Sequence, residues 1–395
     1  MSMIEQAASL KLKKQLRSKI EAGHPWVYQS AIDNQPQLSV GAPVRLIDKN
    51  GFVAWAIYDP GHPIAARVWS LDEQQIPDSA LIQERLVSAI QLRQSLIAKN
   101  VEAFRLVHGE ADGLPGWAID QYRHILVVRS DGRAAEERLP YLQQAIINTP
   151  QLKNIQTIVH RRSRGAQGPR WELLLGQQPE PFSCQEYAWH MEVDVLQGQK
   201  TGWFVDQREN RRLVFDLAAG LRVANLFSYT GGFSLAAALG GATYVESVDI
   251  STNAIKAAEQ NFILNGLSPN EYGFIAEDAF NWFESARQEQ KKFDLVIIDP
   301  PSFAPNQKSL PNAKRAYRRL FRSACQLLSE KGLLAASSCS SHITMQLFRE
   351  LIDESVQQTG KRLQILCERG AGLDHPVIPS FPEGHYLKFV LCRVR

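Results

Sequence analysis

The sequence predicts an α/β protein whose C-terminal part is a mostly parallel sheet covered by helices on both faces. Buried-strand runs alternate with helical stretches over residues 186–395, and such alternation is typical of parallel sheets between helix layers. Short β-branched and aromatic runs, separated by turn residues, occupy residues 10–71, which predicts a compact β-barrel. Residues 72–185 mix strand-like and helical stretches. We therefore expect three domains, at 1–71 (β-barrel), 72–185 (α+β) and 186–395 (α/β).

The composition is that of a globular protein of two or three domains. The chain has 395 residues, of which 44% are hydrophobic and 22% are charged, and a domain usually takes about 100–200 residues. The five cysteines include no Cys-x-x-Cys pair, which argues against a disulfide scaffold or a zinc ribbon and for a reducing compartment. No metal site is expected.

Two features of the sequence bear on where the protein resides. The N-terminal residues lack the apolar stretch of a signal peptide. The segment between Arg222 and Glu246 carries no charge and is long enough to span a bilayer, but it contains several glycines and polar side chains. A strand, a glycine turn and a small-residue helix explain it better, so we expect a cytoplasmic protein with no membrane contact.

The expected barrel carries the whole net charge of the chain. Residues 1–71 hold eight Lys or Arg and five Asp or Glu, an excess of three, and the full chain has a net charge of +3. Five of these cations are clustered with no acid among them. Such a cluster suits a polyanion partner, although a solvated helix face would have the same composition. The cluster consists of Lys11, Lys13, Lys14, Arg17 and Lys19.

Hydrophobic periodicity and turn residues predict the elements before residue 186. In the barrel, strands are expected over 44–48, 52–59 and 65–70, followed by a connecting helix over 81–98. In the central domain, one helix is expected over 137–149 and strands over 104–110, 117–122, 124–130, 155–163 and 171–177.

The same patterns predict the C-terminal elements. Buried strands are expected over 193–196, 222–227, 244–250, 274–278, 293–299 and 332–338. Helices are expected over 234–241, 251–267 and 315–330. Ligands of doubly wound sheets bind outside the carboxyl ends of the strands, so residues that directly follow these runs are candidates for a binding site.

Two motifs at such strand ends suit a nucleotide-like ligand. Gly231-Gly232 follows a strand and opens a helix, so the backbone can approach a ligand closely and the helix N-terminus offers free amides. Asp249 ends the next strand and can accept hydrogen bonds from ribose hydroxyls. The alternative for Asp249 is an N-cap of the following helix, a position that Ser251 could also fill.

Three further motifs follow later strands. Asp278 suits an exocyclic adenine amine, Asp299-Pro300-Pro301 has its backbone fixed by two prolines, and Cys339 stands just beyond another buried strand. This order of motifs resembles the class I S-adenosylmethionine-dependent methyltransferases over residues 186–395. The resemblance implies a Rossmann-like domain with a mostly parallel seven-stranded sheet.

A finer resemblance spans essentially the whole chain. The bacterial 23S rRNA (cytosine-C5) methyltransferases have similar stretches to QKTGWFVDQRENR, NLFSYTGGFS, DPPSFA, SSCSSH and the tail DHPVIPSFPEGHYLKFVLCRV. That family carries an N-terminal PUA domain that binds RNA, a central α+β domain and a C-terminal methyltransferase domain. The division of this chain at residues 71 and 185 reproduces that plan.

By this resemblance, S-adenosylmethionine is the cofactor, and the positions that match the family's donor-binding motifs are its expected contacts. They are Phe204, Asp206, Gln207, Arg208, Asn225, Leu226, Phe227, Ser228, Tyr229, Thr230, Asp249, Ile250, Ser251, Asp278, Ala279, Asp299 and Pro300.

Methylation at C5 of cytosine needs a nucleophile, because C5 itself reacts poorly until a thiolate adds at C6. The resemblance implies that Cys339 is this thiolate and that Asp299 contacts or protonates N3. The base that removes the C5 proton is not identified, and water and Asp299 are both open. Many RNA cytosine-C5 methyltransferases have a second cysteine after the strand-end Asp. Here Pro300-Pro301-Ser302-Phe303 contains none, so the product would be released without a second thiol.

Two other functions stay open. In amino-methyltransferases, an Asp-Pro-Pro-aromatic motif binds an exocyclic amine, so the chain could methylate an amino or ring nitrogen of an RNA base without Cys339. Ser302, between the prolines and Phe303, weakens this alternative. The other is a ribosome-assembly protein that binds RNA without catalysis. The missing GxGxxG pattern argues against a nicotinamide dehydrogenase.

Three basic patches are expected to contact RNA, the N-terminal cluster being the first. Trp26, close behind it, is either barrel core or a platform for an unstacked base. The implied partner is 23S rRNA or a large-subunit assembly intermediate; the oligomeric state is not fixed, and a homodimer is open. The second patch consists of Lys314, Arg315 and Arg318, which follow the strand expected over 293–299. The third consists of Arg161 and Arg162, on a turn of the expected central domain.

Overall fold

The computed structural model describes residues 7–13, 15–33, 37–162 and 169–395. The chain forms two compact units, and it passes between them several times. The first unit contains Met1–Phe182, Val193–Val205 and Leu373–Gly384, and the second contains Ser183–Glu192, Asp206–Gly372 and His385–Arg395. The three-domain division stays a prediction, and the structure shows more crossings than a single boundary at residue 185 would give.

The first unit begins with the expected barrel. Its sheet has the order β1-β3-β4-β5-β2, in which β1 and β3 are parallel and the other pairs antiparallel. The predicted strands correspond to β3, β4 and β5, whereas β1 and β2 are too short for periodicity to reveal them. Their bounds are β1 Ser9–Lys11, β2 Trp26–Tyr28, β3 Pro43–Asp48, β4 Gly51–Tyr58 and β5 Ile64–Ser70, with helix α2 at Arg17–Glu21.

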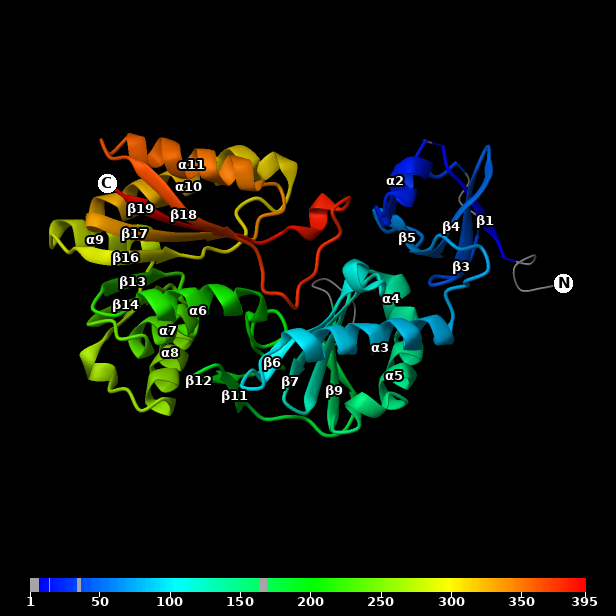
Figure 1. Ribbon diagram of the computed structural model, residues 1–395, viewed down its shortest axis with the longest axis horizontal. Coiled ribbons are helices and arrows are strands. Elements are labelled where there is room, and N and C mark those ends of the chain that lie inside the picture. Colours follow the sequence, from blue (N-terminus) through cyan, green and yellow to red (C-terminus); the bar gives the residue numbers. More distant parts are fainter. Residues whose placement is uncertain (1–6, 14, 34–36, 163–168) are drawn as a thin grey trace. The chain divides into compact units, whose positions relative to one another are not determined.

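The rest of the first unit is an α+β layer. Its sheet has the order β10-β9-β8-β7-β6, and α3 and α5 pack together beside it (Figure 1). All five strands were expected from the sequence. The strands are β6 Ala103–His108, β7 Trp117–Tyr122, β8 Ile125–Ser130, β9 Thr157–Arg161 and β10 Trp171–Leu175. The helices are α3 Ser79–Leu96, α4 Arg133–Glu137 and α5 Leu139–Ile147.

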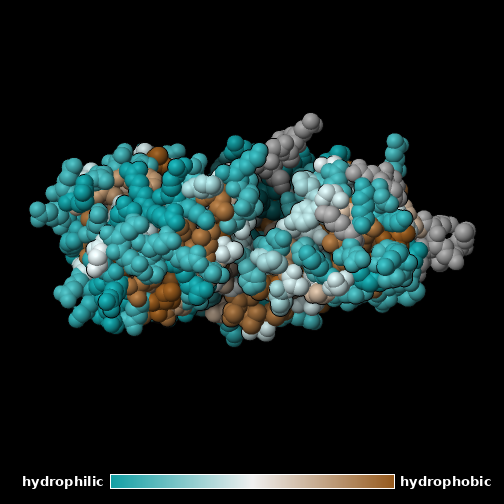
Figure 2. All heavy atoms as spheres, turned by 90° about the horizontal axis from the view of Figure 1, so that it is seen from above, coloured by the Kyte–Doolittle hydropathy of each residue, from teal (hydrophilic) through white to brown (hydrophobic). Residues whose placement is uncertain are grey.

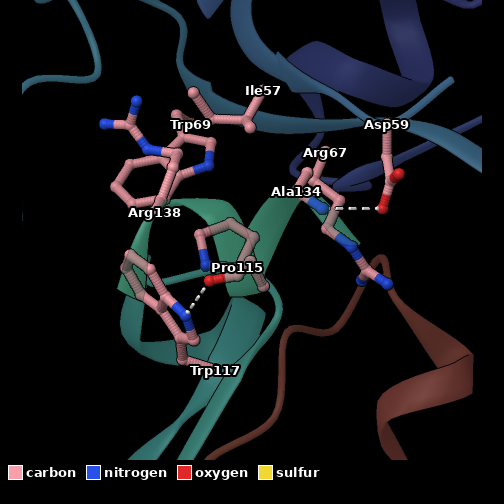
Figure 3. Close-up of a pocket in the computed structure, with 9 residues that line it drawn as sticks. Ile57, Asp59, Arg67, Trp69, Pro115, Trp117, Ala134 and Arg138 are labelled. Atoms are coloured by element: carbon pink, nitrogen blue, oxygen red, sulfur yellow. Dashed lines mark hydrogen bonds between the residues drawn. The ribbon is translucent and has the colours of Figure 1, made fainter. Parts of the chain in front are cut away.

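A small cavity lies where the barrel meets this layer, within the first unit (Figure 3). The Asp59 carboxylate accepts a hydrogen bond of 3.1 Å from the Ala134 amide, and the Trp117 indole donates one of 2.9 Å to the Ala135 carbonyl. The cavity has room for about one water molecule. It is therefore a packing feature between two domains and not a ligand site.

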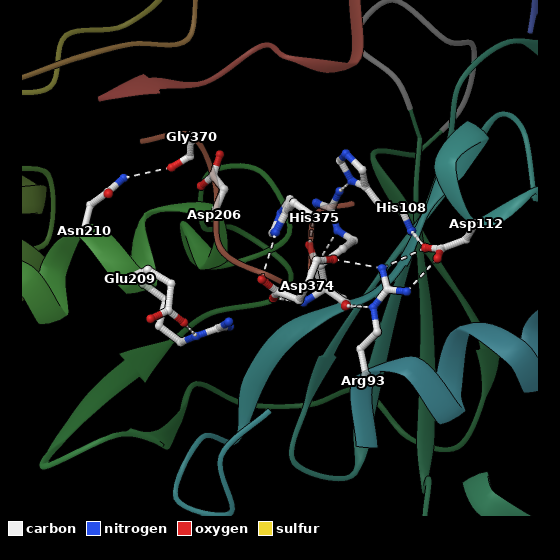
Figure 4. Close-up of polar contacts among 12 residues, drawn as sticks. Arg93, His108, Asp112, Asp206, Glu209, Asn210, Gly370, Asp374 and His375 are labelled. Atoms are coloured by element: carbon white, nitrogen blue, oxygen red, sulfur yellow. Dashed lines mark hydrogen bonds and ion pairs between the residues drawn. The ribbon is translucent and has the colours of Figure 1, made fainter. Parts of the chain in front are cut away.

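Arg93 fixes a late segment of the chain, Leu373–Gly384, onto the first unit (Figure 4). Its guanidinium donates to both carboxylate oxygens of Asp112, at 2.6 and 2.7 Å, and to the Asp374 carbonyl at 2.8 Å. The Asp374 carboxylate accepts in turn from the Arg105 amide at 2.8 Å. Both Arg93 and Asp374 are buried, so the contact consists of buried hydrogen bonds, and the charge of Arg93 is balanced by Asp112.

Trp26 belongs to the same contact. Its indole nitrogen donates to Glu110 at 2.8 Å, and its ring packs edge-on against Phe381 at 4.6 Å between centroids. From the sequence, we expected this residue to be either part of the barrel core or a platform for an unstacked base. The structure shows a third role, in which Trp26 joins the barrel to the central layer and to the late segment.

The second unit is built on a seven-stranded sheet in the order β15-β14-β13-β16-β17-β19-β18. The first five strands of this order pair in parallel, and β19 is antiparallel to both of its neighbours. This sheet confirms the predicted fold class. Its strands are β13 Arg222–Leu226, β14 Tyr244–Asp249, β15 Gly273–Ala276, β16 Phe293–Ile298, β17 Leu328–Ser338, β18 Leu363–Arg369 and β19 Lys388–Val394.

Helices cover both faces of this sheet, with α6, α7 and α8 on one face and α10 and α11 on the other (Figure 1). Glycine is required at the start of α7: Gly231 has a φ of +80°, and a Cβ there would lie 2.8 Å from that of Ala258. The helices are α6 Arg208–Leu217, α7 Gly232–Leu239, α8 Thr252–Leu264, α9 Ala279–Gln288, α10 Leu310–Leu327 and α11 Met345–Gln357. The 3-10 turn η4, Val205–Gln207, precedes α6, and a short hairpin consists of β11 Phe182–Glu186 and β12 Trp189–Val193.

Two sequence expectations in this half were wrong. No strand covers the whole expected run 193–196, because β12 ends at Val193 and the Asp194 carboxylate then accepts from the Leu196 and Gln197 amides at 2.9 and 2.8 Å, which makes a turn. The helix expected to reach residue 330 ends at Leu327, where β17 begins. Periodicity also missed β18, α9 and α11.

The surface seen in Figure 2 is mostly hydrophilic, with hydrophobic side chains in small separate patches. Within the described residues, none of the helices combines the length and the apolar character needed to cross a membrane. The uncharged segment between Arg222 and Glu246 forms β13, α7 and most of the path to β14, as expected.

We predict that the buried pair of Arg211 and Glu186 is essential to the second unit. Two hydrogen bonds of 2.6 Å join them, and both side chains are almost completely buried. Arg211→Met would remove the cation that donates two hydrogen bonds to a buried carboxylate and should lower the free energy of unfolding by about 3–5 kcal/mol, measured by urea denaturation. The control is Arg287→Met, which breaks the exposed pair with Glu284 and should change stability little. Equal losses in the two variants would contradict the prediction.

Candidate active site

The loop between β13 and α7 contains the predicted residues Asn225 to Thr230. Phe227 and Tyr229 have φ values of +59° and +50°, in the left-handed region that costs a non-glycine residue about 1–2 kcal/mol. Strain of this kind is typical of functional loops. The Ser228 amide donates to the Val248 carbonyl at 3.0 Å, which holds the strained loop against the neighbouring strand.

Polar atoms in this loop suit a polar ligand. The Ser228 and Thr230 hydroxyls and the Asn225 Oδ1 atom are buried and have no hydrogen-bond partner among the described residues. Leaving buried polar atoms unsatisfied costs about 1–3 kcal/mol each. A bound molecule with its own donors and acceptors would remove this cost. Leu226, the last residue of β13, is fully buried and anchors the start of the loop in the core.

Asp249 ends β14 beside the loop. One carboxylate oxygen accepts from the Tyr229 amide at 2.9 Å and the other from the Ser251 amide at 2.9 Å. Ser251 itself caps α8, by accepting from the Ala254 amide at 3.3 Å. The N-cap alternative for Asp249 is therefore wrong. Each Asp249 oxygen retains acceptor capacity that a pair of ribose hydroxyls would use, and Ile250 beside it is 74% exposed, an apolar surface at the rim.

Asp278 has a local role that the sequence analysis did not anticipate. It is the N-cap of α9, where its Oδ1 atom accepts from the Phe280 and Asn281 amides at 2.9 and 3.3 Å. Its Oδ2 atom accepts no hydrogen bond from the described residues, so it can still accept one from an amine. The short Asp278 side chain before an apolar helix was the signal for the cap. Ala279, the first residue of that helix, is buried.

The start of α6 connects to the end of β17. The side-chain Nε2 atom of Gln207 donates to the Ser337 hydroxyl at 3.2 Å, and its Oε1 atom accepts from the Asn210 side chain at 2.7 Å. Asp206 accepts from the Tyr386 hydroxyl at 2.7 Å, and Arg208 is buried. Phe204 belongs to the first unit, where the Lys200 ammonium lies 4.3 Å from its ring centroid.

Cys339 and Asp299 stand at the ends of two neighbouring parallel strands. β16 pairs with β17, with Ile298 opposite Ala336, so the residues that follow both strands leave the same edge of the sheet. Cys339 is half-buried. Burial raises the pKa of Tyr317 to about 12, and the charges of Cys339 and Asp299 act in the same direction.

Hydroxyl groups hold the turn that carries Cys339. The Tyr317 hydroxyl donates to Ser338 at 2.8 Å. The Ser340 hydroxyl lies 3.3 Å from that of Ser302 and accepts from the Ala304 amide at 3.2 Å. The turn after β17 is thus tied to the segment that follows Asp299-Pro300-Pro301. Serines around Cys339 in the sequence were the only signal of this arrangement.

Several predicted RNA-binding cations have protein partners. Arg17 donates to both Asp48 oxygens, at 2.7 and 2.9 Å, and to the Phe52 carbonyl at 2.9 Å. By contrast, Lys13 and Lys19 are exposed, and Lys14 lies outside the described residues. The remaining predicted cations contact Asp33 (Lys11), Gly198 (Arg161), Glu172 (Arg162), Asn312 (Arg315) and Glu354 (Arg318), while Lys314 is half-buried.

Two regions of the chain match models of known protein families. Residues 150–361 match the model of an S-adenosylmethionine-dependent methyltransferase family, and residues 10–71 match a PUA-like domain. The chain is 34% identical to ribosomal RNA large subunit methyltransferase I of Salmonella choleraesuis, over 100% of this chain and 99% of that protein. It is 35% identical to the protein of the same name from Shigella boydii, over 94% and 95% of the two chains.

Solved structures share the whole architecture. A protein from Streptococcus mutans assigned as a SAM-dependent methyltransferase superposes with a TM-score of 0.86, at 24% identity, over 98% of this chain and 100% of that chain. A methyltransferase complexed with SAH, the demethylated product of the cofactor, superposes with a TM-score of 0.87, at 25% identity and the same coverage.

We predict that Asp249 contributes directly to cofactor affinity. Asp249→Asn removes the charge that two amides and a ribose would share, so the affinity for S-adenosylhomocysteine should fall about 10- to 100-fold, as measured by calorimetric titration. Asp294→Asn is the matched control, because the Asp294 carboxylate accepts from the Arg222 amide at 3.0 Å at the opposite edge of the same sheet. Unchanged affinity in Asp249→Asn would exclude this role.

Proposed function

This chain belongs to the PUA-domain family of S-adenosylmethionine-dependent methyltransferases that includes ribosomal RNA large subunit methyltransferase I, and we propose that it methylates C5 of a cytosine in 23S rRNA. The family membership rests on identity over the full length of the chain and on the two matched domains. The relatives are named for rRNA of the large subunit, which supports 23S rRNA or an assembly intermediate as the substrate.

One observation supports methylation at C5 rather than at a nitrogen of the base. Cys339 and Asp299 follow adjacent parallel strands, and the Ser340 hydroxyl, next to Cys339, contacts Ser302 and Ala304 of the segment that follows Asp299. A thiol and a carboxyl group at neighbouring strand ends are what an addition to C6, with a partner at N3, requires. A nitrogen methyltransferase has no use for the thiol.

In the proposed reaction, Cys339 and Asp299 have separate roles. The Cys339 thiolate attacks C6 of the cytosine, and the electron pair of the C5–C6 double bond moves toward N3, where Asp299 binds or protonates the base. C5 then attacks the methyl group that S-adenosylmethionine would supply when bound, which leaves S-adenosylhomocysteine as the second product. Loss of the C5 proton restores the double bond, and the C6–S electron pair leaves with sulfur.

The alternative, methylation of a base nitrogen, is disfavoured by the packing of Phe303. In that mechanism the aromatic residue after the prolines stacks on the base. Here the Phe303 ring packs against Tyr317 at 5.2 Å and Phe227 at 6.4 Å between centroids, and it joins the hydrophobic core of the second unit. The ring is therefore engaged with protein partners.

We expect the nucleoside product to identify the reaction. Ribosomal RNA from cells that lack the protein would be incubated with labelled S-adenosylmethionine, digested and separated. Wild type should label 5-methylcytidine, and Cys339→Ala should lose activity by at least about 1,000-fold, because the proposed C6 adduct forms through the Cys339 sulfur.

The control for this experiment is Cys367→Ala. Cys367 is also half-buried, but it lies within β18, so this variant should retain activity. Label in a different nucleoside, or full activity of Cys339→Ala, would establish the nitrogen methyltransferase instead. RNA binding without any turnover would establish the assembly protein.

RNA binding should depend on the exposed lysines of the barrel. If Lys19 contacts one phosphate, Lys19→Gln should weaken binding and lower the slope of log affinity against log salt by about 0.7–0.9, measured by filter binding over a salt series. Lys99→Gln, which removes an exposed lysine of the central layer, is the control and should leave the slope unchanged. An unchanged slope in Lys19→Gln would exclude Lys19 from the RNA interface.

A further inference from the structure

A lysine is buried beside the Cys339 turn. Lys388 is the first residue of β19, pairs in register with Ser338 of β17 and is only 3% exposed. Its ammonium donates to the Ser340 carbonyl at 2.7 Å and to the Tyr386 carbonyl at 2.6 Å. An ammonium has three donors, and these two bonds account for the hydrogen bonds that Lys388 makes to described residues.

The charge of Lys388 lacks a carboxylate partner among the described residues, since none of their Asp or Glu side chains forms an ion pair with it. Lysine is almost never fully buried without such a partner. Burial lowers its pKa to about 8, and the negative charge of Cys339 opposes this shift. Because a pKa of about 8 lies above neutral pH, the ammonium still predominates at pH 7.

We propose that Lys388 is a positioning residue that keeps Cys339 in its reactive thiolate form by supplying the buried positive charge of an ion pair. The inference deepens the proposed function, because it rests on Cys339 being the nucleophile. A nearby cation favours the thiolate, and a buried ammonium is stabilised by an adjacent anion. Each group of the pair thus satisfies the other.

The same charge would assist product release. When a base takes the C5 proton, the C5–H electron pair forms the C5–C6 double bond and the C6–S pair departs with sulfur. The departing sulfur becomes a thiolate on the turn whose Ser340 carbonyl accepts from the Lys388 ammonium. The positive charge lowers the basicity of the sulfur and makes it a better leaving group. The segment after Asp299 holds no second cysteine, so a cation would supply the help that a second thiol gives elsewhere.

Other titratable groups surround this pair and must be separated from it in any pH profile. Tyr317 and Asp299 contribute from α10 and the end of β16, and Tyr386 connects to Asp206 of η4. The charged or titratable groups on the elements packed against β19 also include Arg349 of α11 and Cys367, Glu368 and Arg369 of β18.

The test is the rate of alkylation of Cys339 by iodoacetamide as a function of pH, read by mass spectrometry of its peptide in the full-length protein. Cys367 in the same sample is the internal reference, because it is also half-buried. At pH 7, Lys388→Met should slow alkylation of Cys339 about tenfold, a change that corresponds to about one pKa unit. The profile should move to higher pH, since the thiolate loses its cation. Lys388→Arg should keep most of the rate.

Two variants separate charge from structure. Lys388→Gln keeps an amide donor for the two carbonyls but removes the charge, so it should behave as Lys388→Met. Lys361→Met is the matched control, because Lys361 donates to the Cys325 carbonyl at 2.7 Å and lies away from Cys339 in the fold. It should leave alkylation of Cys339 unchanged.

Two outcomes would overturn the inference, and a measurement on the wild type replaces them if the variants do not fold. Alkylation of Cys339 in Lys388→Gln at the wild-type rate would reduce the lysine to a structural donor. A wild-type profile in Lys388→Met would remove its influence altogether. If both variants fail to fold in a thermal unfolding check, the wild-type profile still decides, because alkylation of Cys339 must then rise at a lower pH than that of free cysteine, whose pKa is about 8.5. None of these readouts uses RNA or cofactor, so a failure here is distinct from failure to form 5-methylcytidine.

Discussion

The candidate site depends on the parallel pairing of β14, β13, β16 and β17. Backbone register fixes Val248 opposite Leu226, Leu226 opposite Ile298, and Ile298 opposite Ala336. Because all four strands run in one direction, the segments that follow them leave the sheet at a single edge. Residues separated by more than a hundred positions in the sequence thereby share one site, without any long-range contact having to form first between their side chains.

Hydrogen bonds, in addition to apolar packing, hold the segments at this edge in place. Tyr317 is embedded among aromatic rings and points its hydroxyl at the Cys339 turn. On the other side, Asp249 holds the left-handed residue Tyr229 by its amide. Holding groups in fixed positions before a substrate binds is a main source of catalytic efficiency, and these contacts would do so on both sides of a reacting base.

Much of this could be read from the sequence, because strand ends and glycine turns leave local patterns. Recognisable buried runs precede the loop between β13 and α7, and also Asp249, Asp299 and Cys339. Features that depend on distant partners left no such pattern. Trp26 finds Glu110 and Phe381, neither of which is near it in sequence. β18 escaped because most of its residues are exposed, and the Asp194 turn resembles a strand in composition. Lys388 reads as an ordinary surface cation until its register with Ser338 is known.

The segment Leu373–Gly384 has a consequence for how the chain is made. It lies between β18 and β19 in sequence, yet it completes the first unit through Arg93 and Trp26. During synthesis, residues before Phe182 therefore emerge while the partners of Arg93 and Trp26 in this segment are still missing, because the segment follows β18 in the chain. A protein that stops short of this point would lose the last strand of the second unit and, at the same time, the seal on the first. Folding of the first unit is in this way linked to the presence of a segment that lies between two strands of the second.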